Sequence, residues 1–279
     1  MLAHWEAPAT ETSLRGATLV LPVVSVGNAG QLAVDLLINT LQMPRVARLQ
    51  DDALLQAVGA RPYPHVQGLA SAFELYQQQP GGVAVAQQRA PAAPGTQVAF
   101  AERLAAFVKQ TGVKEVLVLG SIEATMRRDE QLAGPQLRCW APGTPAQAAD
   151  GSSSEAGSSG VDAVDAASAA LLERCRSGAG APLLEASFWQ DRPLEARCLP
   201  PWPLLRALRS AGVPAAALLC FSSEGDNVAD GLMVASAAAA AAGLQAGTAP
   251  AGDAAESPPL RLLPPPGWQY LYGSTAAVY

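Results

Sequence analysis

The strongest pattern in this chain is a short, mostly apolar run followed by a turn and a helical stretch, and it occurs at least three times. The runs are residues 18–24 (TLVLPVV), 115–120 (EVLVLG) and 216–221 (AALLCF). A strand buried on both faces is continuously apolar, whereas a strand with one exposed face alternates. Such strands, separated by helices, predict a sheet with helical crossovers. We therefore predict an α/β fold, with a central sheet flanked by helices, in a single domain over residues 1–279.

Apolar residues at helical spacing predict the helices of this fold. Leu32, Leu36 and Leu37 share one face of a helix that follows the first strand. Residues 97–110 form a second amphipathic stretch, which Gly112 caps. The further predicted elements are strands at 46–49 and 83–88, a helix at 202–210 and an Ala-rich helix at 228–243.

Two stretches break this alternation. Residues 141–182 are rich in Ala, Ser and Gly, which predicts a flexible surface insertion with one helix at 161–176. Residues 248–267 contain six prolines, so we expect them to wrap the surface without regular structure. Neither stretch separates two apolar cores, which favours one domain.

Composition and charge exclude several classes of function. The chain of 279 residues carries a net charge of −6, which argues against a nucleic-acid or anionic-membrane partner. The Ala-rich stretch 228–243 is too short to span a bilayer and contains Asp230. Neither the four cysteines nor the two histidines have metal-ligand spacing, so we expect no metal and no cofactor. The start lacks the pattern of a signal peptide, and we expect a cytoplasmic and nuclear protein.

Two strand-to-helix turns are candidates for ligand binding. Gly27–Gly30 lies where phosphates are often held, but it lacks the G-x-G-x-x-G spacing and a following Lys. We interpret it as a tight turn with Asn28 as the helix N-cap. In the turn Ser222–Asn227, Glu224 and Asp226 are a possible acid and base, but capping of the next helix is the simpler interpretation.

Other catalytic arrangements are missing from the sequence. There is no G-x-S-x-G or H-E-x-x-H motif. His4 and His65 are expected in exposed loops, and Arg127–Glu130 on a solvated face. Aromatic residues gather near the end of the sequence, including Trp268, which fits either a docked terminus or a recognition tail. We predict that the chain is not an enzyme.

Four collinear blocks resemble the proteasome assembly chaperone 2 family of eukaryotes. They are Leu19–Leu41, Phe107–Ser121 with the following Arg127–Leu132, Phe221–Asn227, and Gly267–Ser274. The resemblance implies a single α/β domain of phosphorylase/hydrolase-like topology without the active site, and no cofactor, metal or catalysis. It also implies a heterodimer with the homologous proteasome assembly chaperone 1. That heterodimer would bind the proteasome α-subunit ring, promote its assembly and prevent off-pathway ring dimers.

The resemblance also implies a role for the last residues. In this family and its relatives, a tail with a hydrophobic residue, a tyrosine and one final residue inserts between adjacent α subunits. Here the sequence ends Ala277-Val278-Tyr279, which departs from that pattern by one position. We expect Ala277, Val278 and Tyr279 to contribute to binding of the α ring.

Two alternatives remain open at this point. One is a nucleoside phosphorylase- or hydrolase-like enzyme that uses Asn28, Glu224 and Asp226. The other is a generic protein-interaction domain with a different partner. A filled strand edge would favour the chaperone, whereas an anion or nucleoside held at both turns would favour the enzyme.

Overall fold

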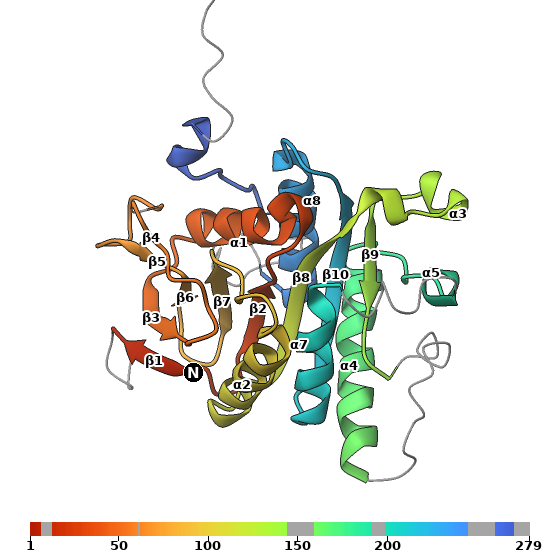
Figure 1. Cartoon of the computed structure of the whole chain (residues 1–279), viewed down its shortest axis with the longest axis horizontal. Coiled ribbons are helices and arrows are strands. Elements are labelled where there is room, and N and C mark those ends of the chain that lie inside the picture. Colours follow the sequence, from red (N-terminus) through yellow and green to blue (C-terminus); the bar gives the residue numbers. More distant parts are fainter. Residues whose placement is uncertain (7–12, 61, 144–158, 191–198, 245–259, 271–279) are drawn as a thin grey trace, which may run out of the picture.

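The centre of the molecule is an eight-stranded sheet with helices on both faces (Figure 1). The computed structural model describes residues 1–6, 13–60, 62–143, 159–190, 199–244 and 260–270. In sheet order the strands are β1 (Leu2–Trp5), β3 (Arg45–Gln50), β6 (Phe73–Gln77), β7 (Val83–Gln88), β2 (Thr18–Pro22), β8 (Glu115–Glu123), β10 (Ala215–Ser222) and β9 (Leu137–Trp140). A separate two-stranded sheet pairs β4 (Val58–Gly59) with β5 (Ala70–Ser71).

The four central strands β7, β2, β8 and β10 are parallel, and antiparallel strands extend the sheet at both ends. Because parallel neighbours need long crossovers, helices connect these strands and cover both faces. The principal helices are α1 (Ala29–Thr40), α2 (Gln97–Gln110), α4 (Ser159–Ser177), α7 (Pro201–Ser210) and α8 (Val228–Ala242). The short elements are α3 (Asp129–Leu132), α5 (Ser187–Gln190) and the 3-10 turns η1 (Val26–Asn28), η2 (Ala124–Met126) and η4 (Pro266–Tyr270).

The sheet separates two apolar layers. On one face, α2 and α7 pack against the strands, while α1, α4 and α8 cover the other. In β2, Leu19 and Leu21 enter the first layer and Val20 enters the second. Both faces of the strand are therefore buried, which explains the continuous apolar run and confirms the predicted α/β sheet flanked by helices.

Helix α4 lies in the second half of the range 141–182, where the sequence predicts a flexible surface insertion. Its Leu171 and Cys175 are completely buried, in the layer that also contains Cys139 of β9. The structure therefore differs from the expectation: this part of the range belongs to the core, and only the helix predicted at 161–176 is confirmed. Residues 144–158 lie outside the described residues.

The described end of the Pro-rich segment crosses the C-terminal end of α1. Residues 260–265 have no regular structure, as expected. The Asn39 side-chain amide donates to the carbonyl oxygen of Leu263 at 2.9 Å, and the Leu263 N–H donates to Thr40 Oγ1 at 2.8 Å. Among the described helices, none is both long and apolar enough to cross a membrane.

Helix α1 lies unusually close to its neighbours on both sides. A Cβ atom at Gly30 would lie 2.8 Å from the carbonyl oxygen of Leu119 in β8, and one at Gly231 of α8 would lie 2.7 Å from Leu32 Cβ. Real Cβ atoms do not approach other heavy atoms this closely, so each position requires glycine. The two glycines therefore set the distance from the sheet to α1 and from α1 to α8.

Replacing Gly30 by alanine should test this packing. Because the new methyl group meets backbone rather than a movable side chain, we expect Gly30→Ala to lower the free energy of unfolding by about 1–3 kcal/mol. Gly59→Ala is the matched control, since a Cβ there meets nothing within 4 Å. Urea denaturation measures both; equal stabilities would show that α1 can move away from β8 at no cost.

Candidate functional site

The two turns singled out in the sequence lie against each other at the carboxyl ends of the strands. Gly27 has a φ of 67°, and a Cβ there would lie 2.6 Å from Asn227 Nδ2 and 3.0 Å from the Ser223 carbonyl oxygen. The Asn227 amide donates to the carbonyl oxygens of Ser223 at 2.9 Å and Gly225 at 3.0 Å. The Asn227 side chain therefore occupies the space beside Gly27, where a bound phosphate would need room.

The capping of the two helices differs between the turns. Asn28 occupies the N-cap position of α1 as predicted, but its side chain makes no capping hydrogen bond. Asn28 instead adopts a left-handed backbone with a φ of 53°, which asparagine tolerates better than most residues. In the other turn, Asp226 Oδ1 accepts a hydrogen bond from the Val228 N–H at 3.1 Å, as capping predicts. Glu224 and Asp226 are both exposed, so they do not form an enclosed acid–base pair.

The carboxyl end of β8 is closed by the start of α7. A Cβ at Gly120 would lie 2.9 Å from Pro201 Cγ and 3.0 Å from Val23 Cγ2. Ser25 Oγ accepts from the Ser121 N–H at 2.9 Å and donates to the Val23 carbonyl oxygen at 3.1 Å. These polar groups at the ends of β2 and β8 thus bond to one another, and apolar atoms fill the space beside them.

A cavity of about 500 Å³ remains between the ends of β2 and β7. The chain leaves β2 toward α1 on one face and β7 toward α2 on the other, and α/β proteins often bind ligands at such a switch point. The lining is almost entirely apolar and includes Val24, Phe100 and Leu204, with Gln88 and Gln97 as its polar side chains. Because none of the lining residues is titratable, the cavity suits an apolar group better than acid–base chemistry.

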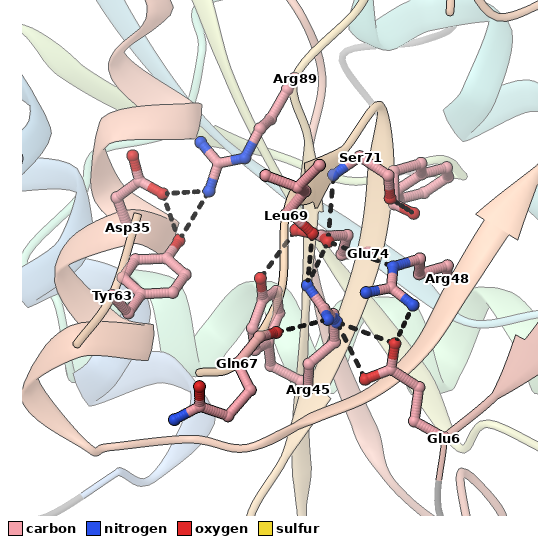
Figure 2. A network of polar contacts seen from close by, with 12 residues as sticks. Glu6, Asp35, Arg45, Arg48, Tyr63, Gln67, Leu69, Ser71, Glu74 and Arg89 are labelled. Atoms are coloured by element: carbon pink, nitrogen blue, oxygen red, sulfur yellow. Dashed lines mark hydrogen bonds and ion pairs between the residues drawn. The ribbon is translucent and has the colours of Figure 1, made fainter. Parts of the chain in front are cut away.

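A buried polar network lies beside α1, on the face opposite α2 (Figure 2). Asp35 Oδ1 accepts hydrogen bonds from the Tyr63 hydroxyl, from Arg89 Nη2 at 3.2 Å and from Gln87 Nε2 at 2.6 Å. Arg89 Nη2 also donates to the Tyr63 oxygen at 3.1 Å. Burial raises the pKa of Tyr63 well above its ordinary value, and the charge of Asp35 raises it further. The phenol is therefore a permanent donor to the carboxylate.

The same interactions determine the charge of Arg89. Burial by itself lowers the pKa of Arg89, but the Asp35 carboxylate together with Tyr63, Tyr76 and Glu74 more than offsets this, and the pKa lies above its ordinary value. The guanidinium and the carboxylate are thus a fixed ion pair. A pair of this kind holds the loop that carries Tyr63 against α1.

A second network surrounds Arg45 of β3 (Figure 2). Its guanidinium contacts Glu74 Oε1 at 2.8 Å and Glu6 Oε2 at 3.0 Å, and donates to the carbonyl oxygens of Gln67 at 2.8 Å and Leu69 at 3.0 Å. Glu6 lies just after β1, Glu74 lies in β6, and the two carbonyls belong to the loop before β5. One side chain therefore joins three segments that are distant in the sequence, which indicates a structural role.

The histidines and Arg127 lie in more ordered surroundings than the sequence suggests. His4 is exposed as expected, but in strand β1 rather than a loop. His65 is half-buried and stacks on Tyr63, with the ring centroids 5.7 Å apart. The guanidinium carbon of Arg127 lies 5.7 Å from the ring centroid of Phe221, so the expectation of a fully solvated face is wrong for this residue.

Cysteines are not activated in the part of the chain that the structure describes. Cys139, Cys175 and Cys220 are buried free thiols. Burial raises the pKa of Cys139 and Cys220 to about 11 and that of Cys175 to about 12, so each stays protonated near neutral pH. In the same described residues, no three His, Cys, Asp or Glu side chains lie close enough to hold a metal ion.

The residues predicted to bind the α ring, Ala277, Val278 and Tyr279, lie outside the described residues. The described part of the C-terminal region ends at Tyr270, and its Trp268 packs against the layer formed by α1 and α8. This contact agrees with a docked segment at Trp268 and leaves the recognition tail a prediction.

Fold and site together define an α/β domain with helices on both faces of its sheet, whose ligand-binding edge is largely closed by Asn227 and Pro201. Comparison with known proteins agrees with this class. The family model described as "PAC2 family" matches residues 19–190. The chain belongs to the PAC2 family.

Curated relatives confirm the resemblance seen in the sequence. "Proteasome assembly chaperone 2" from Danio rerio is 41% identical over 130 residues, which cover 45% of this chain and 50% of the relative. The Homo sapiens protein of the same name is 36% identical over 129 residues, with 45% and 49% covered. The matched region thus spans about half the length of these curated relatives.

Two solved archaeal structures have the same fold. Pyrococcus furiosus PbaA, titled an archaeal homolog of proteasome-assembly chaperone, superposes with a TM-score of 0.57 at 13% identity, covering 88% of each chain. Pyrococcus furiosus PbaB, titled an archaeal proteasome activator, gives a TM-score of 0.58 at 16% identity, covering 88% of this chain and 90% of the other. At these identities the likeness concerns the fold alone.

Removing the Tyr63 hydroxyl should show what the network beside α1 contributes. In Tyr63→Phe, Asp35 loses a buried donor, so we expect the free energy of unfolding at pH 7 to fall by about 1–3 kcal/mol. The raised pKa of Tyr63 stabilises the folded protein below about pH 10, where the unfolded phenol is also neutral, and this stabilisation is lost as the pH rises above that value. Tyr63→Phe should therefore lose less stability than the wild type between about pH 10 and 11. Urea denaturation at each pH measures both effects, and identical curves for the two proteins would contradict this role.

Proposed function

We propose that this protein is a proteasome assembly chaperone. It pairs with the homologous proteasome assembly chaperone 1 and binds the proteasome α-subunit ring, where it promotes ring assembly and prevents off-pathway ring dimers. The observation that carries the proposal is the match of residues 19–190 to the PAC2 family, together with curated relatives named proteasome assembly chaperone 2 at 35–41% identity. The proposal also places the protein in the cytoplasm and the nucleus.

The arrangement of the candidate site supports a binding protein over an enzyme. The enzyme alternative needs Asn28, Glu224 and Asp226 around one ligand. Glu224 and Asp226 are exposed, and the Asn227 side chain fills the space beside Gly27. The remaining cavity between β2 and β7 has an apolar lining without titratable groups. Such a lining accepts an apolar side chain of another protein, as the centres of protein interfaces do.

Affinity capture tests this function directly. The full chain, tagged at its N-terminus, should recover proteasome α subunits and the homologous chaperone from a cell extract, as identified by mass spectrometry. The purified homologous chaperone should then form a 1:1 complex with it in sedimentation experiments. If the folded chain recovers a different set of partners and no α subunit, the chaperone proposal is wrong and the generic interaction domain takes its place.

The last three residues provide a more specific test. We expect deletion of Ala277–Tyr279 to weaken binding to the α ring by about 1–3 kcal/mol, because an aromatic anchor and a paired terminal carboxylate are lost. Binding to the homologous chaperone should not change. Fluorescence titration with α subunits measures the first effect, and sedimentation measures the second.

A matched variant tests whether the effect is specific to the last three residues. Thr275→Ala changes a neighbouring polar side chain and keeps the last three residues, so its affinity for the α ring should equal that of the wild type. An unchanged affinity after the deletion would mean that the homologous partner supplies all of the insertion.

A further inference from the structure

Helices α2 and α7 lie side by side on one face of the sheet (Figure 1). An open groove lies between them. The groove has a volume of about 530 Å³. Its α2 side is a single stripe of residues, and its α7 side carries the exposed Arg206 among short side chains. The stripe consists of Val98, Glu102, Ala106 and Lys109, and Pro203 and Ala207 are among the residues that face it from α7.

This groove is an unpartnered surface within the described residues. Val98 is an apolar side chain that is 60% exposed. Glu102 and Lys109 are exposed, and neither has an ion-pair partner among the residues that the structure describes. Val98 and Pro203 also line the apolar cavity between β2 and β7, so the groove continues into that cavity. An apolar surface with unpaired charges of both signs along it suits a protein partner.

The charges on α2 are arranged symmetrically about a small residue. Glu102 and Lys109 are seven residues apart, which places them on one helix face about 10 Å from each other. The midpoint between them falls next to Ala106, whose methyl group allows another helix to approach to about 8 Å. A two-fold axis at this midpoint would place a second α2 antiparallel to the first.

That arrangement is complementary to itself. Across the axis, Glu102 of one copy meets Lys109 of the other, and the same pair forms again on the opposite side. Val98 of each copy reaches the groove of the other copy, at the end that Ser210 and Ala211 line. The apolar contacts supply the affinity, while the two ion pairs fix orientation and register, since exposed ion pairs contribute little energy by themselves.

We propose that the α2–α7 face is a self-complementary dimerisation surface, which binds a second copy of this chain through antiparallel α2 helices. The proposal concerns the protein alone and goes beyond the chaperone function proposed above. Its occupant follows from the charge pattern of Glu102 and Lys109 about Ala106. A partner helix of unrelated sequence would require no such symmetry.

Charge reversal on α2 gives a test that a general loss of stability cannot imitate. Glu102→Lys and Lys109→Glu each turn two attractive contacts of the dimer into repulsive ones. We expect each variant to dissociate at least 10-fold more readily than the wild type in sedimentation equilibrium of the full chain. An equimolar mixture of the two variants should form a heterodimer within about 3-fold of the wild-type affinity, since every contact is attractive again. The double variant Glu102→Lys/Lys109→Glu should likewise dimerise as the wild type does.

The control is Gln110→Lys, which adds a charge to an exposed position of α2 that does not line the groove and should leave the dimer unchanged. A wild-type chain that stays monomeric overturns the proposal, as does a mixture that associates no better than the separate variants. Recovery of α subunits and the homologous chaperone in the capture experiment is a separate measurement. A failed dimer with successful capture therefore removes only this inference, and a charge-dependent dimer without capture removes only the chaperone function.

Discussion

The position of helix α1 is the constraint on which the rest of the structure depends. The helix lies between the sheet and α8, in contact with β8 through Gly30 and with α8 through Gly231. At its N-terminal end, Gly27 leaves room for the Asn227 side chain, which brings the turn before α8 against the turn before α1. At these points there is no space for one added methyl group. Helix α1 thus fixes the apolar layer that it forms with α8, and it brings the two turns together at the carboxyl ends of the strands.

The sequence could predict the parallel part of the sheet because its strands are buried on both faces. A continuous apolar run makes up most of β2 and β10 and the first half of β8, so their patterns agree with their surroundings. Strand β6 could not be predicted in this way, although all five of its residues are buried, because Glu74 and Gln77 interrupt its apolar run. Glu74 is tolerated there because Arg45 and the Tyr76 hydroxyl bind its carboxylate, and the sequence does not reveal such partners.

The candidate site was predictable to the same limited extent. Glycine-containing turns after apolar runs correctly indicated where the strand edge lies, and Asp226 was found as a cap from its local sequence. Asn28 was ambiguous, since asparagine both caps helices and adopts left-handed turns, and only the fold decides which applies. The contact of Asp35 with Arg89 joins residues 54 positions apart, so no local pattern could reveal it.

The distribution of polar groups separates a closed interior from an open surface. Inside the molecule, Asp35 and Glu74 are each bound by an arginine and a tyrosine, which holds their carboxylates in fixed ion pairs. At the strand edge, packing of Asn227 and Pro201 occupies the positions that a ligand would take. The open surfaces lie outside: the apolar cavity beside β2 and β7 and the α2–α7 groove that continues from it. An α/β domain whose interior is closed in this way offers partners a rigid, preorganised surface, so that little conformational entropy is lost on binding.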